Sequence, residues 1–243
     1  MKTIIVVPCY NEAKRLPQQQ FLNYVQQHDD VVFLFANDGS SDSTLQMLEA
    51  LAKQHERLLT LDIQPNGGKA EAVRKGVMHA VLQYDATYIG FWDADLATPL
   101  FEIENFVTWA DKGYDIVMGL RLMRLGAKVR RKKLRHYLGR SFATSASVML
   151  KLPVYDTQCG AKLFHRRVVE TLFSTPFITR WIFDVEILAR YENAYSAKDA
   201  AEKIYELPLF QWEDVDGSRL KKRDFLNAPK ELLKIRKTYM KKR

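Results

Sequence analysis

The sequence contains few of the residues that cross-link, interrupt or disorder a chain. Its 243 residues include 2 cysteines, 8 prolines and 11 glycines. Cys9 and Cys159 form no CxxC pair and lack the histidine spacing of a zinc site, so we expect reduced thiols rather than a disulfide or a metal centre. With 47% hydrophobic residues the chain can bury its own core, which excludes disordered and collagen-like classes.

Long apolar runs and a targeting segment are absent as well. The longest apolar runs, residues 4–9 and 31–36, are far shorter than the roughly 18 residues that a spanning helix needs. Polar residues end the first run too early for the apolar region of a signal peptide. We therefore expect a protein that is neither secreted nor membrane-spanning and that works in the reducing cytoplasm.

Acidic residues are missing from residues 116–155, and the charge of the chain is divided accordingly. Residues 121–140 contain nine Lys/Arg and no acid, and residues 219–243 contain eleven Lys/Arg and two acids, so each segment carries +9. Because the whole chain is +8, the remainder carries −10. This division predicts that two defined segments meet an anionic partner, whether phosphate, nucleic acid or lipid headgroups. A solvated basic face is the structural alternative.

Strand-like and helix-like stretches alternate regularly in the first half. Short continuous apolar runs are typical of strands buried on both faces. We expect strands at residues 4–8, 31–37, 58–63, 88–92 and 115–119, and helices at residues 16–27, 43–55, 69–84 and 100–112. This order predicts an α/β fold, a mostly parallel sheet with helices on both faces.

The rhythm changes after residue 121. We expect an amphipathic helix at 132–150, a short strand at 162–164, helices at 168–173 and 183–191, and a strand at 203–212. Pro229 is expected to open a final basic helix that runs to residue 239. No linker interrupts the chain, so we interpret residues 1–243 as one domain with a nucleotide half (1–120) and an acceptor half (121–243).

Polar clusters follow three of the expected parallel strands. PCYNE ends the first strand, NDGSSD the second and DAD the fourth. Ligands of open α/β sheets bind at the carboxyl ends of the strands, where the fold would bring these clusters together. Turns and helix caps use the same residue types, but three clusters at equivalent ends favour a site.

Two features of these clusters indicate phosphate chemistry. Asp93 and Asp95 point to the same side of an extended chain, and a divalent cation would relieve their repulsion while holding a substrate diphosphate. NGGK at residues 66–69 precedes a helix, so backbone N–H groups can approach a phosphate while Lys69 and Arg74 add charge. Neither GxxxxGK[ST] nor GxGxxG occurs, which argues against P-loop and dinucleotide-binding proteins.

A set of motifs occurs in one order across most of the chain: PCYNE, NDGSSD, NGGKAEAVRKG, DADLATP, Gly119-Leu120-Arg121, DTQCGAKLF, WIFDVE, and Trp212 followed by Gly217-Ser218-Arg219. Together they resemble the inverting family-2 glycosyltransferases of the GT-A fold, and in particular the dolichyl-phosphate (polyprenyl-phosphate) β-glucosyltransferases. The motifs of the second half carry the narrower resemblance, which covers residues 4–219.

The resemblance implies a metal-dependent hexosyltransferase. It would move glucose from UDP-glucose to a polyprenyl phosphate, with Mg²⁺ or Mn²⁺ held by Asp93 and Asp95. The implied nucleotide-sugar-binding residues are Pro8, Tyr10, Glu12, Asp38, Lys69, Arg74, Asp93, Gln158, Lys162 and Trp181, with Asp38 facing the base. The implied catalytic residues are Asp95, Arg121, Asp156, Asp184 and Glu186, with Arg121 facing the acceptor phosphate.

The chain departs from related enzymes in three ways. Asn37 stands where many have a first Asp. Ala97 stands where mannosyl-phosphate relatives offer Gln, which favours a glucosyl donor over GDP-mannose. The spanning segments of many relatives are missing, so we expect peripheral attachment to the cytoplasmic face of an anionic membrane through residues 121–140 and 219–243.

Alternatives remain open at this point. An enzyme of the same family could extend a saccharide instead. Residues 93–98 superficially resemble the DxDxT motif of haloacid-dehalogenase-type phosphatases, although that motif follows the first strand in those enzymes. A basic nucleic-acid-binding module would explain the two basic segments but not the aspartates or NGGK, so we expect no nucleic-acid partner. Trp181, Asp184 and Glu186 also have structural alternatives, as core and ion-pair residues.

Overall fold

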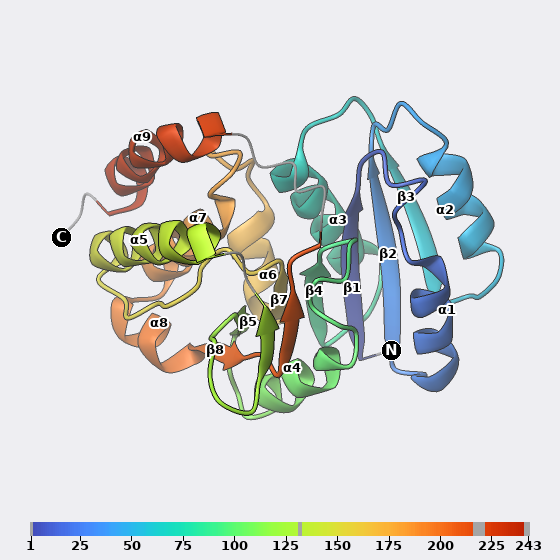
Figure 1. Cartoon of the computed structure of the whole chain (residues 1–243), viewed down its shortest axis with the longest axis horizontal. Helices are drawn as coiled ribbons and strands as arrows, with labels where there is room; N and C mark the ends of the chain where they lie inside the picture. Colours follow the sequence, from blue (N-terminus) through green and yellow to red (C-terminus); the bar gives the residue numbers. More distant parts are fainter. Residues whose placement is uncertain (1, 131–132, 216–221, 241–243) are drawn as a thin grey trace.

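The computed structural model describes residues 2–130, 133–215 and 222–240, and a seven-stranded sheet forms its centre (Figure 1). The strand order is β3-β2-β1-β4-β7-β5-β8. The strands are β1 (Thr3–Cys9), β2 (Val31–Asp38), β3 (Leu58–Ile63), β4 (Tyr88–Trp92), β5 (Ile116–Leu120), β7 (Ala161–His165) and β8 (Ile204–Pro208). Neighbouring strands are parallel except that β7 is antiparallel to β4 and β5. A single sheet therefore runs through both halves of the chain.

The strands are apolar throughout because both faces of the sheet are covered. Along β1, Ile4 and Val6 face one hydrophobic cluster, whereas Ile5 and Val7 face the other. All four side chains are fully buried. This alternation explains why the strands appear as continuous apolar runs in the sequence, and the predicted mostly parallel sheet with helices on both faces is confirmed.

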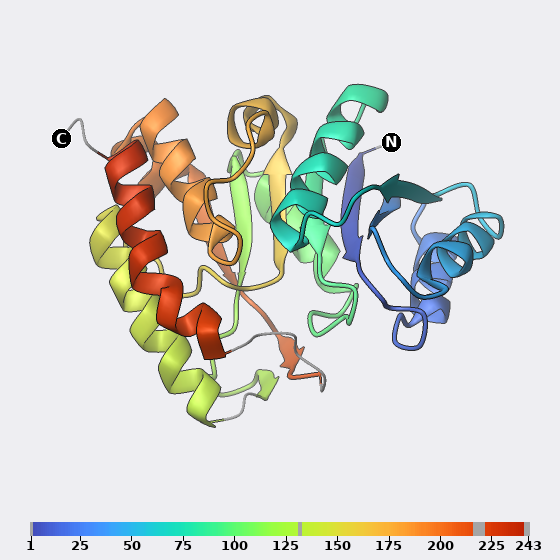
Figure 2. The ribbon, with the colours of Figure 1, turned by 90° about the horizontal axis from the view of Figure 1, so that it is seen from above.

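The helices divide between the two faces of the sheet. On the face of Ile4 lie α3 (Lys69–Gln83), α6 (Arg166–Phe173), α7 (Phe183–Ala194) and α8 (Ala197–Lys203). The opposite face is covered by α1 (Gln18–Gln27), α2 (Thr44–Ala52) and α4 (Glu102–Ala110). Two long helices, α5 (Lys133–Leu150) and α9 (Lys222–Tyr239), run side by side at the end of the molecule away from β3 (Figures 1 and 2).

The second half differs from expectation in three places. The expected strand 203–212 is two strands, β8 and β9 (Gln211–Glu213), and β9 pairs with the unpredicted β6 (Lys128–Arg130) in a separate small sheet. The helix α8 was also not predicted. Pro229 lies inside α9 instead of opening it. Buried Ala228, Leu232 and Ile235 hold this helix against the core, and that packing outweighs the backbone hydrogen bond that proline removes.

None of the helices in the described ranges has an apolar stretch long enough to cross a bilayer.

Candidate functional site

The predicted polar clusters lie at one edge of the sheet, where β1, β2 and β4 end. β1 and β2 are parallel neighbours, and β4 is the parallel neighbour of β1 on its other side. The segments after these strands therefore begin side by side. This edge, with the loop before α3 and the segment before β7, is called the polar edge below.

Asp38 shapes the glycine-rich loop before α3. The Asp38 side chain is buried, and its Oδ1 accepts the backbone N–H of Gly67 at 2.8 Å. Its Oδ2 accepts the backbone N–H of Gly68 at 2.8 Å and the Asn66 side-chain amide at 2.9 Å. These N–H groups therefore bind Asp38, which differs from the expectation that they approach a phosphate. Contact of Asp38 with a nucleotide base stays a prediction.

Asp93 lies open at the end of β4, between the loop before α3 and the segment before β7. Lys69 Nζ lies 2.5 Å from Asp93 Oδ1, and the two side chains are 44% and 35% exposed. The backbone N–H of Asp93 donates to the Gly160 carbonyl at 2.9 Å. A Cβ on Gly160 would lie 1.9 Å from Asp93 Oδ2, so only glycine fits against this carboxylate.

Asp95 is partly buried, like Asp93. Its Oδ1 accepts the backbone N–H of Ala97 at 3.1 Å. Burial raises the pKa of Asp95, and the neighbouring Asp93 carboxylate raises that pKa further, while Lys69 and Arg15 act in the opposite direction. A carboxylate that is partly desolvated beside a second one is stabilised by a cation placed between them.

This arrangement fits a divalent metal only together with a ligand. Within the described residues, no three His, Cys, Asp or Glu side chains are grouped so as to hold a metal ion. Mg²⁺ and similar hard cations are commonly held by one or two carboxylates plus substrate phosphate oxygens. The pair Asp93 and Asp95 supplies that number of carboxylates, and burial together with the neighbouring Asp93 raises the pKa of Asp95.

Arg121 and Asp156 form an ion pair beside the polar edge. The Nε and Nη2 atoms of Arg121 donate to the two Asp156 carboxylate oxygens at 2.7 Å each. Glu206 of β8 holds this segment in place because its carboxylate accepts the backbone N–H groups of Tyr155 and Asp156 at 2.7 Å. The Arg121 guanidinium also lies over the Trp212 ring, 5.2 Å from its centroid. The two predicted residues are thus brought together, with their charges already matched.

Lys162 and Asp184 form a second pair, deeper in the protein. Lys162 is 1% exposed, and its Nζ donates to Asp184 Oδ1 at 2.6 Å. It also donates to the carbonyls of Thr157 and Cys159, at 3.0 and 2.7 Å. Gln158 Nε2 lies 3.5 Å from Asp184 Oδ2. Lys162 therefore neutralises Asp184 and fixes the segment that ends at Gly160.

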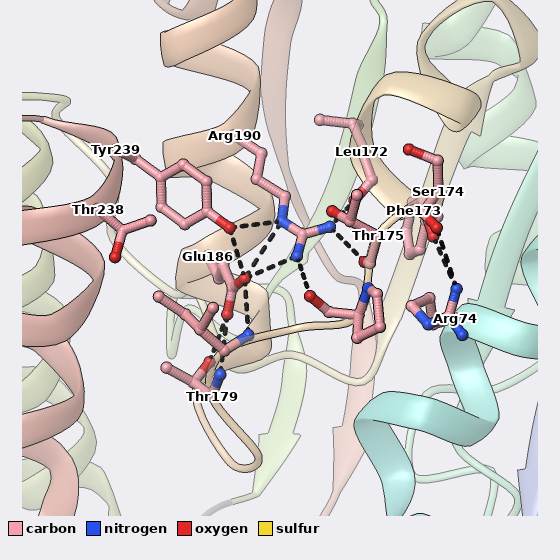
Figure 3. A network of polar contacts seen from close by, with 12 residues as sticks. Arg74, Leu172, Phe173, Ser174, Thr175, Thr179, Glu186, Arg190, Thr238 and Tyr239 are labelled. Carbon is pink, nitrogen blue, oxygen red and sulfur yellow. Dashed lines mark hydrogen bonds and ion pairs between the residues drawn. The ribbon is translucent and has the colours of Figure 1, made fainter.

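Glu186 is not part of the polar edge. It is fully buried on α7, two residues after Asp184 and so on another side of the helix. Its carboxylate accepts the backbone N–H groups of Ile178 and Thr179 at 3.0 Å, Arg190 Nη2 at 2.8 Å and the Tyr239 hydroxyl at 3.0 Å (Figure 3). In this structure the carboxylate is buried and its hydrogen-bond partners belong to the protein, which gives Glu186 a structural role. Its predicted catalytic role stays a prediction.

Arg74 of α3 is engaged by protein groups, and its binding to the nucleotide stays a prediction. Its guanidinium pairs with Glu71 at 2.7 and 2.8 Å and donates to the carbonyls of Phe173 and Ser174, both at 3.3 Å. These contacts join α3 to the end of α6, a structural role that the sequence interpretation as a nucleotide ligand did not foresee.

The remaining predicted donor residues lie at or near the ends of elements that form the site. Pro8 is partly buried in β1, and Tyr10 is 38% exposed just after it. Glu12 is nearly buried, and its backbone N–H donates to Thr44 Oγ1 at 2.8 Å. Trp181 is partly buried, with its ring centroid 5.6 Å from that of Phe142 of α5. Of the C-terminal motif, Gly217-Ser218-Arg219 lies outside the described residues.

Three residues of this region were missed from the sequence: Gly160, Glu206 and Arg180. Gly160 had a signal, because it belongs to the DTQCGAKLF motif. Glu206 had none, since an acid in an ordinary strand gives no hint of the backbone that it holds. Arg180 directly precedes WIFDVE, but its position over the loop before α3 appears only in three dimensions.

Comparisons with known proteins agree with the resemblance. The family model described as Glycosyl transferase family 2 matches residues 4–173. The dolichyl-phosphate beta-glucosyltransferase ALG5A of Trichomonas vaginalis is 30% identical over 95% of this chain and 72% of that protein. The dolichyl-phosphate beta-glucosyltransferase of Dictyostelium discoideum is 30% identical over 97% and 74%, and that of Homo sapiens 29% identical over 97% and 75%.

Solved structures of similar fold include glucosyl-3-phosphoglycerate synthase from Mycobacterium tuberculosis. Its complex with Mn²⁺, UDP-glucose and phosphoglyceric acid has a TM-score of 0.67 at 13% identity, covering 96% of this chain and 78% of that one. Its complex with UDP has a TM-score of 0.65 at 16% identity, covering 96% and 79%. At this level of identity the likeness shows a shared fold.

Proposed function

We propose that this chain, which belongs to glycosyltransferase family 2 and has the GT-A fold, transfers glucose from UDP-glucose to a polyprenyl phosphate of the dolichyl type. The configuration at the anomeric carbon of glucose would be inverted in this transfer. The similarity to dolichyl-phosphate β-glucosyltransferases supports this acceptor, because it covers 95% of the chain or more and so includes the acceptor half. Residues 1–120 would hold the nucleotide sugar and residues 121–243 the acceptor, within one domain.

The observation that carries the phosphate acceptor is the pairing of carboxylates in the acceptor half. Asp156 is paired with Arg121, and Asp184 with Lys162. Neither carboxylate is therefore suited to remove a proton from a neutral alcohol. A phosphate with a second pKa of about 6 is already largely dianionic at pH 7, so it attacks without a general base.

Asp93 and Asp95 would hold Mg²⁺ or Mn²⁺ together with the diphosphate of the donor. The bound cation would offset the charge that develops on the leaving nucleoside diphosphate. The complexes of glucosyl-3-phosphoglycerate synthase with Mn²⁺ and UDP-glucose support this proposal through the shared fold. Lys69, paired with Asp93, would supply a further positive charge at the same place.

We further propose that the enzyme meets the acceptor at an anionic cytoplasmic membrane surface, through residues 121–140 and 219–243. Two exposed apolar side chains support this proposal. Met123 and Leu125, which flank Arg124 and follow Arg121 in the sequence, are 49% and 99% exposed. The Ala127 N–H donates to the Arg124 carbonyl at 3.2 Å, and Gly126 has a φ of +83°, which makes a tight turn with Leu125 at its tip. Exposed aliphatic side chains among cations suit a lipid interface.

Exposed apolar side chains also occur on α5 and α9. Tyr137 and Val148 of α5 are 70% and 73% exposed, and Leu233 of α9 is 54% exposed among exposed lysines. Of the two basic segments, residues 131–132, 219–221 and 241–243 lie outside the described residues. Each Lys or Arg near an anionic bilayer contributes about 1 kcal/mol of binding free energy.

The test is transfer of labelled glucose from UDP-glucose on lipid vesicles that contain either a polyprenyl phosphate or the corresponding neutral polyprenol. We expect glucosylation of the phosphate only, with faster turnover on anionic than on neutral vesicles and loss of this advantage as salt rises. Leu125→Ser should weaken vesicle binding, whereas Leu82→Ser, which changes a 72% exposed leucine on α3, should not. Efficient transfer to polyprenol or to a saccharide would instead identify a saccharide-extending enzyme.

A further inference from the structure

Arg180 lies in the loop between α6 and α7, and the protein fixes this loop from two directions. Just before it, Thr179 is buried, and its backbone N–H and hydroxyl both donate to Glu186 Oε2, at 3.0 and 2.9 Å. The carbonyl of Ile178 accepts Lys234 Nζ of α9 at 2.7 Å. The residue after a backbone held in this way has a defined position, although the Arg180 side chain itself is exposed.

The Arg180 guanidinium lies over the glycine-rich loop of the other half. A Cβ built on Gly68 would lie 3.3 Å from Arg180 Nη2 and 3.9 Å from its Nε. Gly68 is the N-cap residue of α3 and has a φ of +84°. The following residue is Lys69, which reaches Asp93. Arg180 thus crosses from the acceptor half to the amino-terminal end of a nucleotide-half helix, where the helix dipole favours an anion.

No carboxylate of the described residues pairs with Arg180. The other cations of the polar edge are paired: Lys69 with Asp93, Lys162 with Asp184, and Arg121 with Asp156. For Arg180, no hydrogen bond or ion pair is found with any residue that the structure describes. An arginine without a counter-ion, over the loop that precedes Lys69 and its partner Asp93, has the chemistry of a phosphate-binding residue.

We infer that Arg180 binds the diphosphate of the nucleotide sugar, reaching it from the acceptor half. This inference rests on the proposed function, since it assigns a residue to the donor of that reaction. The diphosphate is favoured over the acceptor phosphate because Arg180 lies over the loop before α3, whereas Arg121 lies beside the acceptor-half segment that contains Asp156. The buried Glu186 carboxylate would then support donor binding indirectly, because it fixes the backbone next to Arg180.

The test compares the binding of UDP and of uridine, measured by calorimetry in the presence of Mn²⁺, for the wild type, Arg180→Gln and Arg180→Lys. A lost charge-assisted hydrogen bond should weaken UDP binding by about tenfold or more in Arg180→Gln. Uridine binding should stay within about twofold of wild type, because uridine lacks the diphosphate. Arg180→Lys should restore part of the UDP affinity. Lys198→Gln removes the same charge from an 82% exposed side chain on α8 and should have no effect.

The outcomes separate this inference from the proposed function. If Arg180→Gln binds UDP as tightly as wild type does, Arg180 is not a diphosphate ligand, and a raised KM for polyprenyl phosphate in that variant would assign it to the acceptor. A wild type that binds no UDP would likewise overturn the inference. If UDP affinity falls as expected but the wild type transfers no glucose to polyprenyl phosphate, the inference stands and the proposed acceptor is wrong.

Discussion

The two halves of the molecule use charged side chains in different ways. At the polar edge of the nucleotide half, Asp93 and its partner Lys69 are 35% and 44% exposed, so water and ligands reach both. In the acceptor half, Lys162 and Asp184 are 1% and 7% exposed, and Arg190 and Glu186 are 4% and 0% exposed. Charges of the first kind can exchange a protein partner for a ligand, whereas charges of the second kind hold the backbone.

The difference follows from desolvation. A buried charge is stable only when a partner and further hydrogen bonds replace its water, so a buried pair resists exchange with a ligand. The buried pairs of the acceptor half therefore hold the backbone, whereas the exposed Arg180, which has no counter-ion among the described residues, is a charge of the first kind. The buried pairs fix the segment that ends at Gly160 and the loop that carries Arg180.

The strongest test of this contrast is Glu186→Ala. Removing this carboxylate leaves Arg190 buried without its counter-ion and the N–H groups of Ile178 and Thr179 without their acceptor. Breaking a buried pair in this way costs about 3–5 kcal/mol, which should lower Tm by roughly 6–20 °C in a protein of this size. Thermal unfolding followed by circular dichroism measures the change. Glu213→Ala, which removes a 61% exposed acid, should shift Tm little; equal shifts would refute the contrast.

At the polar edge the same kind of change should affect turnover instead of stability. Asp95→Asn removes one metal-compatible carboxylate and no core volume. We expect a fall in kcat of about 10²–10³-fold, equivalent to roughly 3–4 kcal/mol of transition-state stabilisation, because the leaving diphosphate loses its cation. Tm should stay close to that of wild type. Asp29→Asn, an exposed acid at the other end of the strands, is the matched control. Wild-type turnover with unchanged metal dependence would remove Asp95 from the site.

The smallest expected effect is a pH dependence of metal binding. The pKa of Asp95 is raised above its ordinary value of 3.8, so the folded protein holds this proton more tightly than the unfolded chain does. The contribution of Asp95 to stability is therefore fully present below pH 3.8 and is lost as pH rises through the raised pKa. Mn²⁺ needs the deprotonated carboxylate, so the Tm increase caused by Mn²⁺ with UDP should grow over the same pH range. In Asp95→Asn this growth should be flattened.

Most of the fold could be predicted because its main signals are local. The buried strands appear as apolar runs, and the polar clusters after β1, β2 and β4 follow directly in the sequence. Pairing such as that of β6 with β9 could not be predicted, because two three-residue strands far apart in the chain carry no periodic pattern. The position of Pro229 inside α9 depends on the tertiary contacts of that helix, which outweigh its local preference.

The residues of the candidate site also differ in whether a local sequence signal predicts their position. The position of Asp93 and Asp95 at the polar edge could be predicted because they directly follow a buried strand, and their role there stays a prediction. Asp184 and Glu186 could not be told apart, because both lie in one motif and only the packing of α7 shows that one meets Lys162 and the other Arg190. Arg180 depends on a contact between residues more than a hundred positions apart, which no motif spacing encodes.

Helix α9 packs against the interior of the enzyme on one side and is exposed to solvent on the other. On its inner side α9 contributes Lys234 to the Ile178 carbonyl and Tyr239 to Glu186, while Leu233 and Lys237 are exposed on its outer side. A truncation that ends the chain before Phe225 would therefore disturb the Arg180 loop as well as the proposed lipid contact. If lipid contact steadies α9 and α9 steadies that loop, the two bindings are linked, and linkage is reciprocal. A bound nucleotide sugar would then raise the affinity of the enzyme for the membrane by the same factor by which the membrane raises its affinity for the sugar.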